Sequence, residues 1–105
     1  MAQIIWTEPA LNDLNEIAEY IALDKAHAAE TLVRSVFRTV QRLKDFPESG
    51  KKPEELPETE SRGVIAGPCR IFYRVHQESV CILYIMRGEK ELRRFILSDR
   101  NDEIS

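Results

Sequence analysis

The sequence predicts an α+β domain in which a helical hairpin packs on a small, twisted and mainly antiparallel sheet. Apolar residues recur at three- and four-residue steps through residues 7–24 and again through residues 25–46, which is typical of two amphipathic helices. Two β-prone runs fill residues 69–88, and only the polar segment His76-Gln77-Glu78-Ser79 separates them, so we expect them to pair antiparallel. Short apolar segments before the helices and before this hairpin complete the expected order, β-α-α-β-β-β.

Length and composition indicate one domain of the ordinary globular class. The 105 residues fit a single domain spanning 1–105, of which residues 98–105 are expected to form a loose tail. A chain this short holds one modest core, so we expect no cofactor and no metal. No apolar run approaches the about 20 residues that span a membrane, and residues 1–9 show no secretory signal. We therefore expect a cytoplasmic protein without a membrane partner.

The first strand and first helix are predicted from residues 3–24. Gln3–Trp6 is short and apolar, as expected of a strand. Thr7 is suited to the N-cap of the following helix, and Pro9 is tolerated in its first turn. The predicted buried stripe of this helix contains Ala10, Leu11, Leu14, Ile17, Ala18 and Ile21.

The second helix is predicted to begin after an Asp24 N-cap and to end before Pro47, which cannot continue a helix. The short join around Asp24 favours an antiparallel helical hairpin. Residues 48–61 are rich in proline and charge, so we expect a mobile connection. The stripe of the second helix contains Ala29, Leu32, Val33, Val36, Phe37, Val40 and Leu43.

The strands beyond this connection are predicted at 62–66, 70–76 and 80–87, and residues 92–97 form either a last strand or a short helix. Pairing around a turn at residues 77–79 places Cys81 opposite Val75 and Cys69 opposite Arg87. The two sulfurs would then lie beyond disulfide reach, so we expect two free thiols.

Charge is unevenly distributed along the chain. The whole chain carries −3, whereas residues 1–61 carry −5 and residues 62–100 carry +4. Two interpretations remain open: solvated strand faces, or a basic surface that meets an acidic partner. The basic residues in question are Arg70, Arg74, Arg87, Lys90, Arg93 and Arg94.

The chain resembles the RelE/ParE superfamily of small bacterial toxins over about residues 4–96. The resemblance rests on the order and spacing of short landmarks rather than on any one of them. These landmarks are Ile5-Trp6-Thr7, the apolar face of the first helix, Phe46-Pro47-Glu48-Ser49-Gly50-Lys51, Tyr73-Arg74-Val75, Ile82-Leu83 and Met86-Arg87-Gly88.

Within this superfamily, the resemblance implies one of two activities. Nuclease members cut messenger RNA on the ribosome and need a C-terminal general acid or base, usually Tyr or His. Here Phe95 occupies about that place and carries no titratable proton, and the pI near 5.4 is low for a protein that binds RNA. We therefore predict a ParE-like, non-enzymatic poison of DNA gyrase, with no catalytic residues and no sequence-specific nucleic-acid binding. A ribosome-dependent RNase and a non-toxic relic that binds only antitoxin are the alternatives.

The resemblance also implies a cognate antitoxin that wraps the toxin in a hetero-oligomer, with a helix along the helical hairpin and an extended segment near the sheet. The candidate residues for gyrase binding are Arg87, Lys90, Arg93 and Arg94. The candidates for antitoxin binding are Leu32, Val36, Phe37, Val40, Phe72 and Arg74. An open alternative is that the chain's own core consumes the stripe of the second helix entirely.

Overall fold

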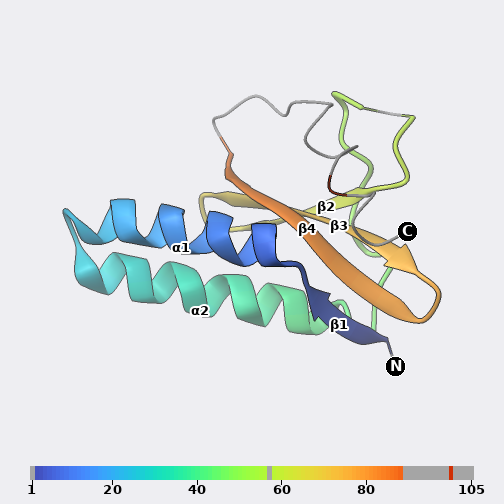
Figure 1. The fold of residues 1–105 in the computed structure, drawn as a ribbon, viewed down its shortest axis with the longest axis horizontal. Helices are drawn as coiled ribbons and strands as arrows, with labels where there is room; N and C mark the ends of the chain where they lie inside the picture. Colours follow the sequence, from blue (N-terminus) through green and yellow to red (C-terminus); the bar gives the residue numbers. More distant parts are fainter. Residues whose placement is uncertain (1, 57, 89–99, 101–105) are drawn as a thin grey trace.

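A computed structural model describes residues 2–56, 58–88 and 100 of the chain. Two helices lie side by side as an antiparallel hairpin against one face of a twisted four-stranded sheet (Figure 1). The predicted α+β class and the order β-α-α-β-β-β are confirmed. The predicted last element, at residues 92–97, lies outside the described residues, as do residues 98–99 and 101–105 of the expected tail.

Helix α1 spans Glu8–Ala22 and begins as predicted. The Thr7 side chain accepts a hydrogen bond from the N–H of Ala10 at 3.3 Å, and Pro9 lies in the first turn. Thr7 Oγ1 also donates to the carbonyl of Ile82 at 2.7 Å. One threonine therefore caps the helix and ties its start to the sheet.

Helix α2 spans Ala26–Arg42, and both predicted ends need correction. Lys25 rather than Asp24 is its N-cap, and no side chain satisfies the first N–H groups there. The α-helix ends well before Pro47, because the backbone tightens at Leu43, Lys44 and Asp45 into hydrogen bonds to carbonyls three residues earlier.

The sheet has the order β1-β4-β3-β2. Strand β1 (Gln3–Trp6) runs parallel to β4 (Ser79–Arg87), while β3 (Cys69–His76) pairs antiparallel with both β4 and β2 (Arg62–Ala66). Strands β1 and β2 are thus the two edges among the described strands. The sheet is mixed but mainly antiparallel, as predicted.

One of the two predicted residue pairs in the β3–β4 hairpin is confirmed, and the other is wrong. Cys69 lies opposite Arg87, but Cys81 lies opposite Arg74 and not Val75. The reason is a bulge at Leu83, which shifts the pairing by one residue, together with a turn of only Gln77 and Glu78 in which Gln77 has a φ of 56°. Cys69 and Cys81 are both buried, and neither forms a disulfide, as expected.

Two apolar clusters lie on opposite faces of the sheet. The larger joins both helices to Ile71, Tyr73 and Ile82, and the smaller contains Leu56, Phe72 and Met86 with Tyr84 packed against it. Leu56 belongs to the connection that we expected to be mobile; instead, this residue is buried against the sheet. No helix within the described residues is long and apolar enough to cross a membrane.

Candidate partner-binding surfaces

The stripe of helix α2 is largely inside the protein. Leu32, Val36 and Val40 are buried in the main cluster, so a partner cannot contact them while the chain keeps this fold. Phe37 differs, because it is 39% exposed and its ring lies 4.8 Å from that of Trp6. Of the four helix residues predicted to bind antitoxin, only Phe37 is exposed. The other three are part of the protein's own core, which is the alternative interpretation given above.

The two strand residues predicted to bind antitoxin lie on the sheet face opposite the helices. Phe72 is fully buried there under the connection, and its ring stacks on Tyr84 with centroids 6.0 Å apart. Arg74 is partly exposed and forms an ion pair with Glu60 at 2.9 Å. Phe72 is therefore a packing residue, whereas Arg74 remains at the surface.

Arg87 is the one predicted gyrase-binding residue that the structure describes. It ends β4, and its guanidinium lies 5.5 Å from the ring centre of Tyr20 on α1, an exposed tyrosine. Such a contact orients the cation without burying it. The other three predicted residues, Lys90, Arg93 and Arg94, lie outside the described part of the chain.

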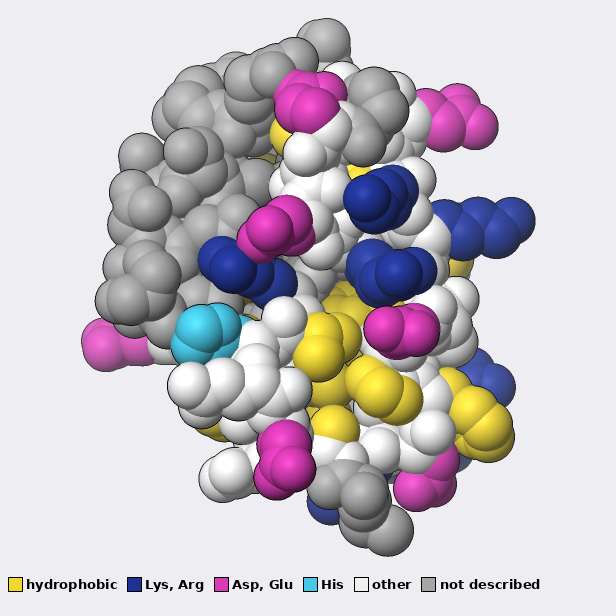
Figure 2. Space-filling model, turned by 90° about the vertical axis from the view of Figure 1, so that its right-hand side faces the viewer, with side chains coloured by type: hydrophobic (Ala, Val, Ile, Leu, Met, Phe, Trp, Pro, Cys, Tyr) yellow, Lys and Arg dark blue, Asp and Glu magenta, His cyan; other side chains and the backbone are white. Residues whose placement is uncertain are grey.

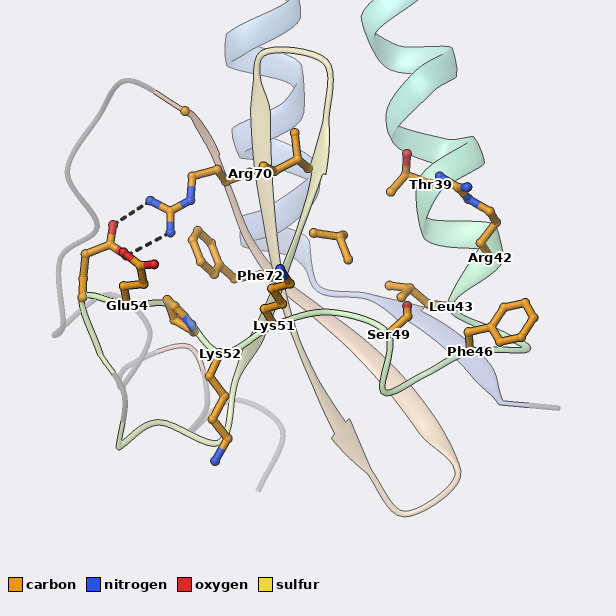
Figure 3. A pocket seen from close by; sticks show the side chains of 16 residues that line it. Thr39, Arg42, Leu43, Phe46, Ser49, Lys51, Lys52, Glu54, Arg70 and Phe72 are labelled. Carbon is orange, nitrogen blue, oxygen red and sulfur yellow. Dashed lines mark hydrogen bonds and ion pairs between the residues drawn. The ribbon is translucent and has the colours of Figure 1, made fainter.

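A groove of about 950 Å³ follows the edge of β2 (Figure 3). On one side of this strand lie residues from the end of α2 and the turn after it, among them Arg42 and Phe46. On the other side lie Lys52 and Glu54 of the connection with Arg70 and Phe72 of β3. We call this feature the β2 groove; its remaining lining residues are Thr39, Leu43, Ser49, Lys51, Pro53, Glu55, Gly63, Val64, Ile65 and Gly88.

The edge of β2 inside this groove is only partly paired. Lys51 and Gly63 exchange two backbone hydrogen bonds, at 3.0 and 2.7 Å, on the side away from β3. Ile65 is two residues further along, so its N–H and C=O point the same way. Among the described residues, no hydrogen bond satisfies these two groups. The Ile65 side chain is also 73% exposed, an unusual state for a large apolar residue.

The cations of the β2 groove fall into two groups. Arg70 binds the Glu55 carboxylate through two hydrogen bonds, at 2.6 and 3.0 Å, and this contact lowers the pKa of Glu55 to about 2. By contrast, Arg42, Lys51 and Lys52 have no ion pair within the described residues. Together with the Glu54 carboxylate, which also lines the groove, these three cations leave a net charge of +2 beside the exposed apolar side chains of Ile65 and Phe46.

The end of the molecule that carries the N-terminus and the β3–β4 turn shows the same mixture. Hydrophobic side chains gather in the middle of this face, and Lys and Arg side chains lie directly above them (Figure 2). Acidic groups are spread singly around these two areas. A charged rim around an apolar centre is the usual anatomy of a protein-binding surface.

The described residues contain no group of three or more His, Cys, Asp or Glu side chains that could hold a metal ion. Burial raises the pKa of the Tyr73 phenol, which donates to Pro47 and accepts from Gly50, and burial also raises the pKa of the Cys81 thiol. Both groups therefore keep their protons at neutral pH.

A sequence model of a protein family, described as the ParE toxin of type II toxin–antitoxin system, parDE, matches residues 4–92 of this chain. The chain belongs to the ParE toxin family. It is 33% identical over 89 residues to "Putative toxin Y4kP" of Sinorhizobium fredii, covering 85% of this chain and 91% of the relative. A chain from a solved structure, the chromosomal ParDE TA system from P. aeruginosa, superposes with a TM-score of 0.70 at 27% identity, covering 85% of this toxin and 98% of that chain.

Sequence reasoning missed the β2 groove of this ParE toxin. The groove forms because Leu56 folds the connection back onto Phe72, which brings Lys52 and Glu54 near β2. One signal was present: Leu56 is the single large apolar residue in a charged segment. A lone apolar residue in such a segment commonly anchors a loop to a core.

Proposed function

We propose that this toxin inhibits DNA gyrase and that a cognate antitoxin neutralises it by binding along the β2 groove. Two lines support this: membership of the ParE family, and similarity to a chain solved as part of a ParDE toxin–antitoxin system. The proposed action is non-enzymatic and uses no cofactor. The observation that carries the antitoxin part is the open edge at Ile65 in a groove whose lining carries a net positive charge.

The chemistry of the β2 groove defines the antitoxin segment that fits it. An extended peptide can add to the sheet by bonding to the N–H and C=O of Ile65. Its apolar side chains would cover Ile65 and Phe46, which are 73% and 63% exposed. Its carboxylates would lie near Arg42, Lys51 and Lys52. We therefore propose an acidic, extended segment with interspersed apolar residues.

A second antitoxin contact is proposed on the helical hairpin. Phe37 and Trp6 form a partly exposed aromatic pair between α2 and β1, beside a smaller hollow lined by Ile4 and Gln41. A helix of the antitoxin could bury this pair, as the resemblance implies. One antitoxin chain that binds this aromatic pair, the β2 groove and Arg74 would contact both the helical side of the toxin and the opposite face of the sheet.

The proposed gyrase contact lies at the end of β4. Arg87 at the end of β4 is the described member of the predicted basic group, and Lys90, Arg93 and Arg94 follow it in sequence. Positive charge at one end speeds encounter with an acidic protein surface or with gyrase-bound DNA. Met86 lies in register with Arg70 and Ile65, so this contact and the open edge at Ile65 share one end of the sheet, two strands apart.

The antitoxin part is tested by charge reversal in the β2 groove. The double variant Lys51→Glu, Lys52→Glu is compared with Arg34→Glu, Arg38→Glu, which makes the same charge change on the exposed side of α2. We expect the groove variant to arrest growth normally but to bind antitoxin at least about tenfold more weakly, because like charges now face each other. Equal neutralisation of both variants would reject the β2 groove as the antitoxin site.

The gyrase contact is tested by Arg87→Ala with Arg38→Ala as its matched control. We expect the first to need at least about tenfold more protein for the same inhibition of supercoiling, and the second to behave as the wild type. Both substitutions remove one arginine, so a difference between them cannot come from net charge. Equal inhibition by both variants would exclude Arg87 from the contact.

A further inference from the structure

One carboxylate in the β2 groove is bound by the toxin itself. Glu55 of the connection accepts two hydrogen bonds from the guanidinium of Arg70 on β3, at 2.6 and 3.0 Å (Figure 3). Two parallel bonds of this kind fix the orientation of a carboxylate as well as its position. The groove therefore contains a complete carboxylate-binding site, and Glu55 occupies it.

An aromatic ring fixes the cation of this site. The guanidinium of Arg70 lies 5.0 Å from the ring centre of Phe72, which is fully buried and stacks on Tyr84. The face of an aromatic ring attracts a cation and restricts its movement. A binding group that is held in place beforehand loses less conformational freedom when a ligand binds. Arg70 is thus prepared to bind a carboxylate from another chain.

Arg70 also lies level with the open edge of β2. It pairs in register with Ile65, whose outward N–H and C=O have no partner within the described residues. Directly paired residues carry their side chains on the same face of a sheet, which here is the face opposite the helices. A peptide strand added at this edge lies two strand spacings, or about 10 Å, from the backbone of Arg70. Extended Arg and Glu side chains together span that distance.

Glu55 is able to leave the site without unfolding the connection. Its side chain is 35% exposed, and an ion pair that water reaches to this extent is weak. The next residue, Leu56, is buried against the sheet and anchors the connection independently of the ion pair. Exchange of one carboxylate for another also leaves Arg70 paired throughout. A second carboxylate that enters the groove can therefore replace Glu55 at little cost.

We propose that Arg70 binds a carboxylate of the antitoxin segment in the β2 groove and that Glu55 competes for the same place. The inference rests on the proposed function, in which an acidic, extended segment adds to the edge of β2. It gives that segment one required acidic position, set by Arg70. It also makes Glu55 an internal competitor, because its carboxylate must be displaced before the segment binds.

The competition is tested with Glu55→Gln and its matched control Glu54→Gln in the full-length toxin. Both residues line the β2 groove and both changes remove one negative charge, but only Glu55 forms an ion pair with Arg70 within the described residues. Affinity is measured for purified antitoxin and for a short synthetic peptide of alternating Glu and Val. We expect Glu55→Gln to bind both ligands about two- to fivefold more tightly than Glu54→Gln. Equal affinities of the two variants would overturn the proposal.

Removal of the guanidinium supplies a second readout. In an Arg70→Gln background, Glu55→Gln and Glu54→Gln should change the affinity equally, because no shared site is left to compete for. Arg70→Lys should narrow the difference, since lysine keeps the charge but cannot form two parallel bonds. Unfolding midpoints confirm that each variant is folded. A difference that persisted in folded Arg70→Gln protein would contradict competition at Arg70.

The peptide separates this proposal from the antitoxin site as a whole. The same peptide with Gln in place of Glu should bind Glu55→Gln no better than Glu54→Gln, and failure of the Glu peptide to bind wild type and Glu55→Gln would overturn the carboxylate site. If the Lys51→Glu, Lys52→Glu variant bound antitoxin normally, the β2 groove would be rejected as the antitoxin site. The peptide comparison would still show whether Glu55 competes at Arg70.

Discussion

The hydroxyl of Tyr73 accepts a hydrogen bond from the backbone N–H of Gly50 at 2.9 Å. The same hydroxyl donates to the carbonyl of Pro47 at 2.8 Å, so one phenol on β3 binds both ends of a short turn after α2. This contact gives a physical reason for the Phe-Pro-x-x-Gly-basic landmark. The proline supplies an acceptor, and the glycine allows its backbone to approach the ring.

Gly50→Ala should destabilise the protein because no space exists for a methyl group. A Cβ at this position would lie 2.6 Å from the Tyr73 hydroxyl and 2.9 Å from the carbonyl of Gly63. We expect a loss of about 1–3 kcal/mol in the free energy of unfolding, as for other overpacked sites. Urea unfolding followed by fluorescence of Trp6 measures it. Glu48→Ala, an exposed change in the same turn, serves as the control, and equal stability of the two would contradict this reading.

Tyr73→Phe should leave the Gly50 N–H and the Pro47 carbonyl without their partner, at a cost of about 1–3 kcal/mol. It should also change the alkaline response. Burial raises the pKa of Tyr73 above its usual value of 10, so the folded state keeps this proton to higher pH than the unfolded state. That stabilisation is complete below pH 10 and is lost as the pH rises toward the folded pKa. Unfolding midpoints above pH 10 should therefore fall more steeply in the wild type than in Tyr73→Phe.

Glu55→Gln should flatten the acid response of stability. The contact with Arg70 lowers the pKa of Glu55 from 4.5 to about 2. The stabilisation is complete above the unfolded value and is lost as the pH falls from 4.5 toward 2. Because the pair is partly exposed, we expect no more than about 1 kcal/mol. Thermal unfolding at stepped pH measures it, and parallel curves for wild type and variant would show that the ion pair contributes nothing.

Thr7→Val should loosen the junction between α1 and β4. The substitution keeps the shape but removes the acceptor for Ala10 and the donor to Ile82, which should cost about 1–2 kcal/mol. Thr31→Val, on the exposed side of α2, is the isosteric control. Denaturant unfolding compares the two. A cost no larger than that of the control would mean that the cap is dispensable.

Much of the fold followed from local patterns. The Thr7 cap and the β-prone runs each acted over a few residues and appeared as predicted. The apolar stripes are confirmed except at Leu11 and Phe37, which were predicted to be buried but are 42% and 39% exposed. The Leu83 bulge was not predictable, because β-prone residues fill both alternating sets in β4 and leave the register weakly specified. The predicted end of α2 was too late. Pro47 marks the last point at which a helix must stop, but the α-helical hydrogen bonds already give way after Arg42 to bonds between residues three apart.

The candidate surfaces were less predictable than the fold. Leu32, Val36 and Val40 fit an exposed docking stripe and a core stripe equally well, and only the position of the sheet separates the two. Nothing in the sequence around Asp13 points to its contact with Arg100. Contacts between residues this far apart arise from the topology, and a single sequence carries little sign of them.

We propose that this toxin poisons gyrase without cutting RNA. The most direct test incubates the purified full-length protein with gyrase, supercoiled plasmid and ATP, and then measures linear DNA released from the trapped cleavage complex. We predict that linear DNA accumulates with toxin concentration, that added antitoxin prevents this, and that ribosome-bound messenger RNA stays intact. Cleaved messenger RNA together with unaffected gyrase would contradict the account and favour the ribonuclease alternative.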